Sequence, residues 1–547
     1  MNAAPCSRSR PILPRRMFSR RMISLAGCAA LAGSLAGCVD LAPKYRHQHY
    51  LLPDNWKGDS LMQYGTPQDG APRGDWWTVF NDSTLDDLED RASRMNPNLQ
   101  ADAETFTQAR DIAAEAQSNL YPQISGGSGA SMNQASSHRL WRGAGSQGPI
   151  YMSSEQYSAT ARWEPDFWSA IRNRRRVQQR MAQAAAADFA TARLSIQSEL
   201  ANDYMQLRGM DAQHAVYLDS IRYYQTAVQI TKMRQAGAIA AGIDVARAQT
   251  QLASTQAADT DLQAHRAVME HAIAILCNVA PSSFHIAPRG QISFPKVKTP
   301  VGLPSTLLER RPDIASAERH MAAANRAIGI SRAAFYPHVT FSAMAGFMDN
   351  GFTLDKIANG MYNYAAQAVL PLFQGGLRRA ELQRNWSQYR QSEDQYRATV
   401  LDAFKDVEDG LSMTHDLNIE AGQQAEAVQA SMRTQNMTMQ LYTGGLTNYL
   451  DVVVAQVAAL QARIAEVQVE TRYMQAQVEL IRSLGGGWST AELPNNKQIR
   501  PFDVMQYNHL RMPKAVSGVN VDNGPESLDL SGSGFHDKDL TGTPKQR

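Results

Sequence analysis

The sequence predicts a mixed fold in which short β-strands of the membrane type are joined to very long α-helices, and in which this unit occurs twice. Three observations lead to this prediction. Two long stretches, 166–280 and 372–493, contain no proline although the chain has 24. Several short segments alternate apolar and polar residues. Landmark residues of the first half recur in the second half at a nearly constant distance.

The repeat is read from these landmark residues. Pro97 and Pro312 lie 215 residues apart, and Asp244 and Asp451 lie 207 apart, so the distance changes little along the chain. Each half reads as helix, strand, loop, strand, long helix, turn, long helix. We therefore expect an internally duplicated chain with four strands, and not a solenoid of short repeats.

Three segments alternate with the period of a β-strand. Between Tyr157 and Phe167 the odd-numbered residues are apolar or aromatic, while the even-numbered residues are polar. Residues 339–347 and 362–372 repeat the pattern, and residues 121–131 form a weaker, glycine-rich fourth strand. Such strands suit lipid on one side and water on the other, with aromatic residues near the interfaces. The alternative is an ordinary sheet that is buried on one side.

The stretches without proline are rich in Ala, Gln, Arg and Glu, which favours helix. One helix from about 172 to 236 would be on the order of 100 Å long. Mainly apolar residues three and four apart, from Leu382 to Leu411, predict helix-to-helix packing that the charged Glu393 interrupts. A helix as long as the one predicted from 172 to 236 is better suited to crossing a periplasm than to filling a globular domain.

The first 37 residues have the features of a secretory signal peptide, since arginines precede the apolar stretch Met22–Gly37. Leu-Ala-Gly-Cys occurs twice, ending at Cys28 and at Cys38, and resembles a lipoprotein processing site. Only cleavage before Cys38 leaves an apolar core of the usual length, roughly 7–15 residues. We expect Cys38 to carry covalent diacylglycerol and palmitate. The alternative is a signal that is cleaved elsewhere.

Charge, cysteine content and hydropathy exclude several classes of protein. Removing residues 1–37 takes away six arginines and no acid, so the formal net charge falls from +2 to −4. No concentrated basic face points to nucleic acid. The mature chain keeps only Cys38 and Cys277, so a lipidated Cys38 leaves no internal disulfide. No uninterrupted apolar run of 18 residues follows the signal, so no transmembrane helix is expected.

Four strands cannot close a barrel, because unpaired edges would leave backbone amides unsatisfied in hydrocarbon. Several subunits would have to close it together.

Three motifs carry a resemblance to a known family. They are Cys38-Val-Asp-Leu-Ala-Pro-Lys-Tyr45, Trp76-Trp77-Thr-Val-Phe80 and, most specific, Leu303-Pro-Ser-Thr-Leu-Leu-Glu-Arg-Arg-Pro-Asp-Ile314. From about Cys38 to Trp488 the chain resembles the outer-membrane factors, which are TolC-like export ducts. Within them it resembles the lipoprotein branch that includes OprM and the nodulation-type (NodT) efflux outer-membrane lipoproteins.

The resemblance implies a homotrimer with one twelve-stranded membrane β-barrel and a long α-helical barrel. It implies a lipid-anchored protein of the cell outer membrane that contacts its lipids, extends into the periplasm, and meets a periplasmic adaptor protein and a proton-driven inner-membrane transporter. The implied function is a passive duct of a tripartite efflux pump for small molecules such as drugs and toxic compounds. A type I protein secretion duct and a lipid-anchored periplasmic coiled-coil scaffold are the alternatives.

The resemblance also points to the turns that join the long helices. It implies that Gly237, Gly444 and Gly445 lie at the periplasmic tip and contact the adaptor. Asp244 and Asp451 would line the closed aperture, with Tyr442 as a neighbour. The alternative is that each aspartate only stabilises the first turn of its helix through the helix dipole.

The chain departs from the pattern of TolC at these turns and elsewhere. Thr447 stands in the place of an arginine partner and Val454 in the place of a second acid, which makes a salt-bridge latch doubtful. Hydrogen bonding and apolar packing would then contribute more to closure. Ser169 and Cys277 stand where the resemblance leads us to expect glycine.

No catalytic constellation is found, so we do not expect an enzyme, and no cofactor is expected apart from the lipid on Cys38. The histidines lack metal-ligand spacing. Gly126-Gly-Ser-Gly129 lies in a predicted strand, without the context of a phosphate loop, and suggests a crowded barrel wall. We interpret Arg310-Arg311-Pro312-Asp313 as a helix start, since Thr306 and Glu309 have capping-box spacing.

These features divide the chain into six segments. They are a signal peptide (1–37), a lipidated linker with an equatorial segment (38–95), a first repeat (96–290), a linker (291–310), a second repeat (311–488) and a largely disordered C-terminal extension (489–547).

Overall fold

A computed structural model describes residues 39–45, 74–136, 150–290, 307–349 and 359–499. The chain divides into two compact units. The strand unit contains residues 1–43, 119–174 and 327–382, and the helical unit contains residues 44–118, 175–326 and 383–547. The predicted signal peptide, Cys38 and Thr306 lie outside the described residues, as does the predicted C-terminal extension beyond residue 499.

The main helices come in pairs of equal length, one member from each half of the chain. Two helices have 67 residues, two have 35 and two have 22. The pairs are α4 (Ala170–Ala236) with α8 (Leu377–Thr443), α5 (Gly242–Leu276) with α9 (Tyr449–Ser483), and α3 (Pro97–Ser118) with α7 (Pro312–Ala333). A 67-residue helix is about 100 Å long at ~1.5 Å per residue. This agrees with the length predicted from the absence of proline.

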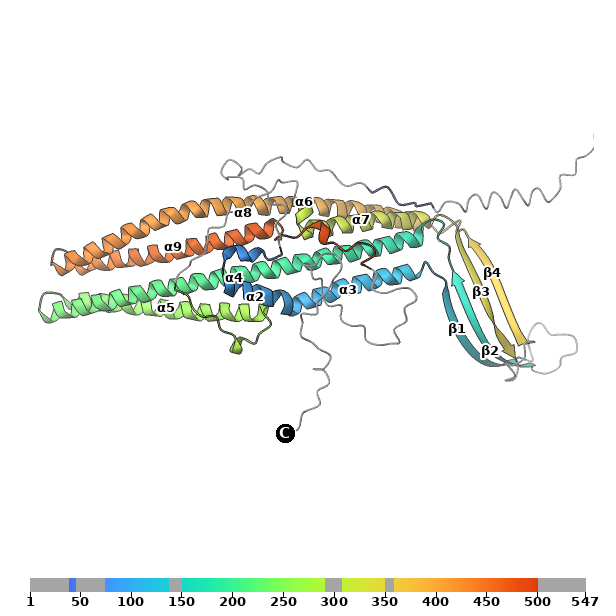
Figure 1. The fold of residues 1–547 in the computed structure, drawn as a ribbon, viewed down its shortest axis with the longest axis horizontal. Helices are drawn as coiled ribbons and strands as arrows, with labels where there is room; N and C mark the ends of the chain where they lie inside the picture. Colours follow the sequence, from blue (N-terminus) through green and yellow to red (C-terminus); the bar gives the residue numbers. More distant parts are fainter. Residues whose placement is uncertain (1–38, 46–73, 137–149, 291–306, 350–358, 500–547) are drawn as a thin grey trace, which may run out of the picture. The chain divides into compact units, whose positions relative to one another are not determined.

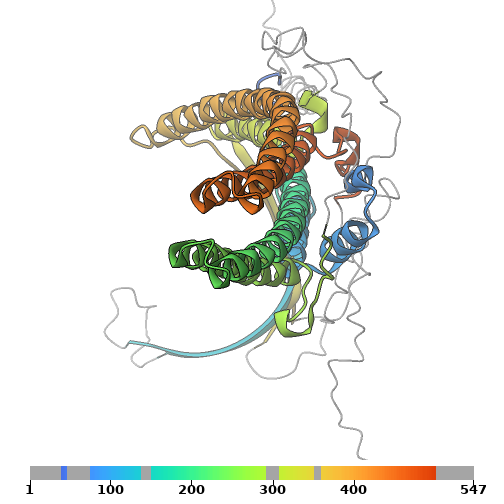
Figure 2. The same cartoon turned by 90° about the vertical axis from the view of Figure 1, so that its left-hand side faces the viewer.

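Within the helical unit, α4 and α5 form one long hairpin and α8 and α9 form another. The two hairpins lie side by side with their turns at the same end (Figures 1 and 2). Shorter elements complete the unit: η2 (Trp76–Phe80), α2 (Ser83–Met95), η3 (Pro281–Ser283), α6 (Leu307–Arg310) and η6 (Thr490–Glu492).

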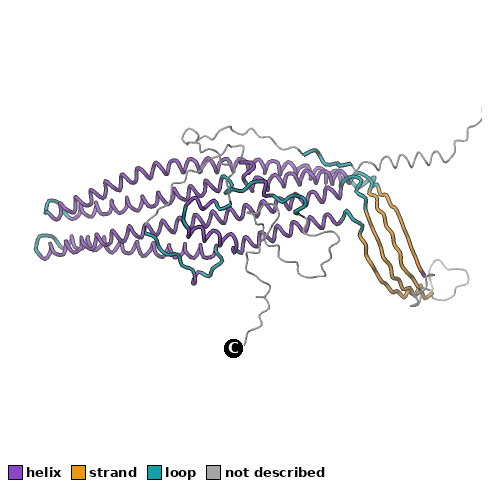
Figure 3. Tube along the Cα trace, viewed as in Figure 1, coloured by secondary structure: helices purple, strands orange, loops and turns teal. Residues whose placement is uncertain are grey.

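The strand unit contains one antiparallel sheet with the strand order β1-β2-β3-β4; its strands are labelled in Figure 1 and coloured orange in Figure 3. Its strands are β1 (Gln123–Ala135), β2 (Ile150–Trp163), β3 (His338–Asp349) and β4 (Gly360–Val369). Each half of the chain therefore contributes one antiparallel strand pair, and β2 with β3 joins the two pairs.

The strand register brings the predicted apolar residues onto one face. Tyr157 lies opposite Phe347, and Trp163 lies opposite Phe341 with the rings stacked 6.1 Å apart. Tyr362 continues the same row, opposite Ala345. The neighbouring residues, such as Arg162 opposite Ser342, fall on the other face and are mainly polar, with Met344 and Met348 among them. The alternation in the sequence thus becomes a two-sided sheet.

Two strands end earlier than their sequence patterns suggest. The pattern of β2 continues to Phe167 and that of β4 to Leu372, but the strands end at Trp163 and Val369. Proline has no N–H to donate to a neighbouring strand, and Pro165 and Pro371 follow these ends.

Side chains along both edge strands are exposed, so neither face of the sheet there is buried by the described parts of the chain. This argues against an ordinary sheet that is buried on one side. The glycines of β1 lie on an edge strand, and within this single chain a Cβ added at Gly126, Gly127 or Gly129 would meet nothing within 4 Å. Gly346 of β3 is crowded, because a Cβ there would clash with the Tyr157 carbonyl oxygen of the neighbouring strand.

The start of α4 is fixed inside the strand unit. The Asp166 carboxylate accepts hydrogen bonds from the backbone N–H groups of Ile171 and Arg172, at 3.1 and 2.8 Å. Ser169, where glycine was expected, has a left-handed φ of 56°. This is the backbone conformation that favours glycine. The other expected glycine position, Cys277, has an ordinary φ of −84°, and the left-handed residue there is Asn278 at 53°.

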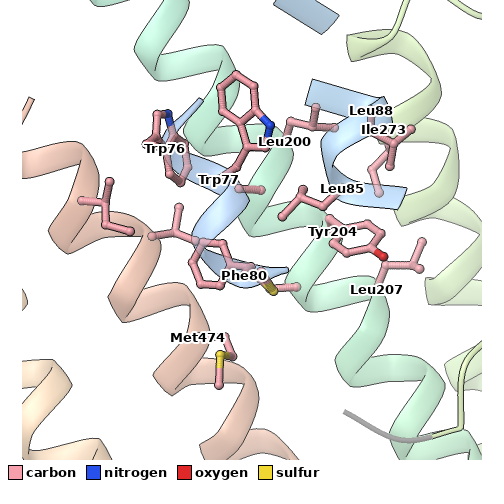
Figure 4. Packing of buried hydrophobic residues seen from close by; sticks show 14 of the residues in the cluster. Trp76, Trp77, Phe80, Leu85, Leu88, Leu200, Tyr204, Leu207, Ile273 and Met474 are labelled. Carbon is pink, nitrogen blue, oxygen red and sulfur yellow. The ribbon is translucent and has the colours of Figure 1, made fainter. Parts of the chain in front are cut away.

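The main core of the helical unit packs η2 and α2 against α4, α5 and α9 (Figure 4). Trp76 and Trp77 meet edge to face with ring centroids 5.9 Å apart. Phe80, Leu85 and Tyr204 are almost completely buried. The Trp76-Trp77-Thr-Val-Phe80 motif therefore serves to attach the N-terminal segment to the long helices.

The predicted apolar seam of α8 runs from Leu382 to Leu411, and it is buried mainly over residues 396–411. Tyr396, Val400, Val407 and Leu411 form a cluster with Ile314 of α7 and other residues. Residues 489–499 also pack on the helical unit, because Ile499 is buried against Ala113 and Ala182. The C-terminal extension thus begins with an attached segment.

The Arg310-Arg311-Pro312-Asp313 segment is a helix start, with Pro312 as the first residue of α7. Arg311 does more than the sequence suggested. Its guanidinium donates to Asp313 at 2.7 Å, to Asp406 of α8 at 3.2 Å and to the Ser483 carbonyl of α9 at 3.2 Å. The motif therefore ties three helices together.

Among the described helices, α9 is long and apolar enough to cross a membrane by length and composition. Only 33% of its most apolar stretch is buried in this chain, but its C-terminal part, including Val469, Tyr473 and Val478, contributes to the main core. Packing between helices accounts for the apolar character of that part.

Candidate functional site: the paired helix turns

The turns at the ends of the two hairpins have the same backbone structure. In the first, Gly237 N–H donates to the Met233 carbonyl and Ile239 N–H to the Arg234 carbonyl. In the second, Gly444 N–H donates to the Gln440 carbonyl and Leu446 N–H to the Leu441 carbonyl. Each of these positions is offset by 207 residues, which is the offset found in the sequence. The internal duplication is therefore visible even in the individual backbone hydrogen bonds of the two turns.

One residue of each turn has a left-handed backbone. It is Gly445 in the second turn, with φ 78°, and Ala238 in the first, with φ 53°. Gly237 and Gly444 do not require positive φ, and a Cβ at either would make only ordinary contacts. Of the three predicted tip glycines, only Gly445 has the positive φ that favours glycine.

Asp244 and Asp451 both lie in the first turn of their helices, α5 and α9. There each carboxylate is favoured by the helix dipole. Asp451 is also held by a hydrogen bond from the Thr447 hydroxyl. The Asp451 N–H donates to the Asn448 side chain, which caps α9. Thr447, which stands where the resemblance leads us to expect an arginine, thus provides Asp451 with a polar partner.

The two hairpins share a small core next to their turns. Val228 of α4, Ala248 of α5, Tyr442 of α8, and Tyr449 and Val452 of α9 are all buried in it. The rings of Tyr442 and Tyr449 meet with centroids 5.1 Å apart and planes at 64°. Tyr442, predicted as a neighbour of the aspartates, is therefore part of the packing between hairpins, with 3% of its surface exposed.

Arg234 adds a charged contact between the hairpins. Its guanidinium carbon lies 4.7 Å from the centroid of the Tyr442 ring. Its Nη1 donates to the Thr443 carbonyl oxygen at 2.9 Å. No pattern in the sequence points to Arg234, because its partners come from the other half of the chain.

Besides burial, the Asp244 carboxylate contributes to the raised pKa values of Tyr442 and Tyr449, the two tyrosines of this small core. Burial raises the pKa of Tyr442, the Asp244 carboxylate adds to the rise, and the Arg234 guanidinium opposes it. Burial raises the pKa of Tyr449 to about 12, and Tyr442 and Asp244 contribute. Both phenols therefore stay neutral at physiological pH. The Asp244 carboxylate thus contributes to the raised pKa of Tyr442, while Asp451 is paired with Thr447.

The remaining predicted positions are exposed or lie outside the described residues. Val454, in the place of a second acid, has 62% of its surface exposed. Among the described residues no group of three or more His, Cys, Asp or Glu side chains is arranged to hold a metal ion. Cys38 is not described, but its neighbour Val39 donates a backbone hydrogen bond to the Phe167 carbonyl at 3.1 Å.

Comparison with known proteins agrees with this architecture. Residues 88–278 and 303–486 match the family described as outer membrane efflux protein. The chain is 30% identical over 482 residues to the pyoverdine export outer membrane protein OpmQ of Pseudomonas aeruginosa, covering 86% of this chain and 98% of that protein. It is 26% identical over 469 residues to the cation efflux system protein CusC of Escherichia coli O6:H1, covering 84% and 98%.

A solved structure shares the fold. The CmeC outer membrane channel of Campylobacter jejuni is similar with a TM-score of 0.75 at 19% identity, over 83% of this chain and 96% of that one. At this identity the likeness concerns the fold alone.

Proposed function

Because the chain belongs to the outer membrane efflux protein family, we propose that it is the outer-membrane channel subunit of a tripartite efflux pump and exports small molecules passively. The protein is located in the outer membrane and extends into the periplasm. Its relatives are efflux channels, not enzymes. The proposed partners are a periplasmic adaptor protein and a proton-driven inner-membrane transporter.

Small molecules are the proposed cargo because the relatives are named for small cargo. OpmQ is named for pyoverdine export and CusC for cation efflux. A type I protein secretion duct would instead pass an unfolded polypeptide. These names favour the efflux of small molecules without selecting one.

The observation that carries the proposal is the two-sided sheet with open edges. One face is mainly apolar and aromatic, the other is mainly polar, and β1 and β4 have no further strand beside them among the described residues. In hydrocarbon such edges must be paired. Three copies would join β1 of one subunit to β4 of the next and give a closed barrel of twelve strands. A periplasmic coiled-coil scaffold would have no use for such a sheet.

The paired helix turns are the proposed periplasmic end. A trimer would bring Asp244 and Asp451 of each subunit, six carboxylates in all, to one constriction, where they would repel one another and attract cations. Gly237, Gly444 and Gly445 are the proposed adaptor-contacting residues. Ile239 and Leu446 follow them with 69% and 78% of their surfaces exposed, which suits a surface that a partner covers.

Cys38 is the proposed lipid attachment site, with diacylglycerol and palmitate. The residues that follow it are held on the strand unit. Asp40 accepts a hydrogen bond from the Asn173 side chain at 2.8 Å, and Arg332 donates to the Leu41 carbonyl at 3.1 Å. These contacts would place the acyl chains beside the start of α4.

The function is tested in two steps. The purified full-length protein is first analysed for subunit number and for conductance in planar lipid bilayers, where we expect a trimer that forms pores. A trimer without conductance would favour the scaffold. The gene is then deleted, and tolerance is measured for a panel of antibiotics, dyes, iron chelates and metal salts, with the complemented strain as control. Unchanged tolerance together with a lost secreted polypeptide would favour the protein secretion duct.

A further inference from the structure

Arg234 is a single side chain of the first hairpin that makes two contacts with the second. The guanidinium lies over the Tyr442 ring, 4.7 Å from its centroid, and donates to the Thr443 carbonyl oxygen at 2.9 Å. Tyr442 and Thr443 are the last two residues of α8. Arg234 itself lies in the last turn of α4. The contact therefore joins the C-terminal ends of the two long helices.

Both contacts suit a guanidinium. The last carbonyl groups of a helix have no partner inside the helix and lie at its negative end, so a cation there is favoured. A cation over an aromatic ring is attracted by the ring, and the attraction grows when water is excluded. Tyr442 is almost completely buried, with 3% of its surface exposed. Arginine can make both contacts at once because its planar group has several donors.

The two repeats do not share this contact. Their turns match hydrogen bond for hydrogen bond, but the positions equivalent to Arg234 and Tyr442 are Leu441 and Gln235. One partner thus occurs only in the first repeat and the other only in the second. A contact that merely stabilised a hairpin turn would need neither partner from the other hairpin.

We infer that the contact between Arg234 and Tyr442 holds the two hairpins of one subunit together next to the aperture and keeps the resting channel closed. This inference rests on the proposed function. Thr447 and Val454 stand where the resemblance leads us to expect the residues of a salt-bridge latch, and Arg234 supplies a charged contact between the two hairpins instead. The contact is assigned to the Tyr442 ring, because the guanidinium lies over its face and the buried hydroxyl has no hydrogen bond to the described residues; Tyr442→Phe tests this assignment.

The test measures the resting conductance of the full-length protein in planar bilayers. Arg234→Gln keeps length and polarity but removes the charge, and Tyr442→Leu removes the ring. Couplings of this kind typically change an equilibrium by about 5–150-fold, so we expect the resting open probability to rise about tenfold in each variant. The double variant should not exceed the single variants. Tyr442→Phe keeps the ring and should stay within about twofold of the wild type.

Arg433→Gln is the matched control. Arg433 also lies on a long helix, and the hydrogen bond described for it goes to the Gln429 carbonyl of its own helix, at 3.2 Å. It should leave the resting current unchanged. The thermal stability of each trimer is measured in parallel, so that a variant that has lost its fold is recognised.

The outcomes distinguish a failure of the inference about Arg234 and Tyr442 from a failure of the proposed function. Wild-type protein that forms no pores contradicts the proposed function itself. If the wild type forms pores, a resting current of Arg234→Gln that is equal to or below the wild-type value overturns the inference. A large rise in Tyr442→Phe overturns it as well, because the hydroxyl would then be the partner.

Discussion

Replacing Glu89 tests whether the core of the helical unit contains a carboxyl group without a partner. Glu89 lies on the buried face of α2 and has 0% of its surface exposed. Neither carboxyl oxygen has a hydrogen bond to the described residues. Burial alone raises its pKa well above the ordinary 4.5. The folded protein therefore holds this proton more tightly than the unfolded chain does.

The sign of the pH effect follows from this difference. Below the unfolded pKa both states are protonated, and the group does not oppose folding through its charge. As the pH rises above that value, the unfolded chain releases the proton first. The contribution of Glu89 to stability then falls by about 1.4 kcal/mol per pH unit, until the folded pKa is reached. Glu89→Gln removes this slope, and Glu89→Met should in addition stabilise by about 1–3 kcal/mol, since no buried polar group is left unpaired.

The assay is denaturant unfolding of the purified protein from pH 5 to 8, followed by circular dichroism. The quantity of interest is the difference between wild type and variant, because other titrating groups cancel in it. Asp90→Asn is the control, since the Asp90 side chain is 56% exposed and pairs with Arg94 at 2.6 Å. Its difference should be small and flat, because exposed ion pairs contribute about 0–1 kcal/mol. Parallel stability curves for wild type and Glu89→Gln would refute the reasoning.

Three further predictions concern the candidate sites. Asp451→Ala should change cation selectivity or resting conductance in bilayers, and identical currents would leave only the role of a helix-start residue. Gly445→Ala should destabilise by about 1–2 kcal/mol, because alanine is strained at positive φ. Ala238→Gly should stabilise slightly, and a reversed order of these two in denaturant unfolding would contradict the turn geometry. Cys38→Ser should abolish labelling with radioactive palmitate, and an unchanged label would exclude Cys38 as the attachment site.

Much of the fold could be predicted because its signals are local and repeated. The absence of proline predicted helices of about the observed length, and α4 begins at Ala170, two residues from the predicted start. Alternation predicted one apolar face on three of the four strands, while the first strand was predicted only weakly from its glycine-rich sequence. Register then joined these faces, because antiparallel strands pair residues of like orientation. The strand ends were less predictable, since the apolar pattern continues past the point where Pro165 stops hydrogen bonding.

The contacts between distant segments could not be predicted in the same way. Arg311 reads as part of a helix start, and its bonds to Asp406 and Ser483 depend on how α7, α8 and α9 pack. Glu89 reads as one more charge in an acidic helix, since Asp86, Asp87 and Asp90 surround it in the sequence. Its burial follows from the orientation of α2 in the core. Side chains of this kind are determined by tertiary packing, which leaves no periodic signal.

The two helix turns share one backbone structure but differ in how firmly their aspartates are held. The start of α9 is capped by Asn448, and Thr447 holds Asp451, whereas α5 begins after Ala241 without a side-chain cap. Asp244 is correspondingly less restrained, since no hydrogen bond to its side chain is found among the described residues. An aspartate that accepts a hydrogen bond from a neighbouring hydroxyl, as Asp451 does through Oδ2, is restrained in position. An aspartate with free oxygens can respond to a cation or a partner. We therefore expect the proposed aperture to combine a fixed acid from the second repeat with a responsive acid from the first.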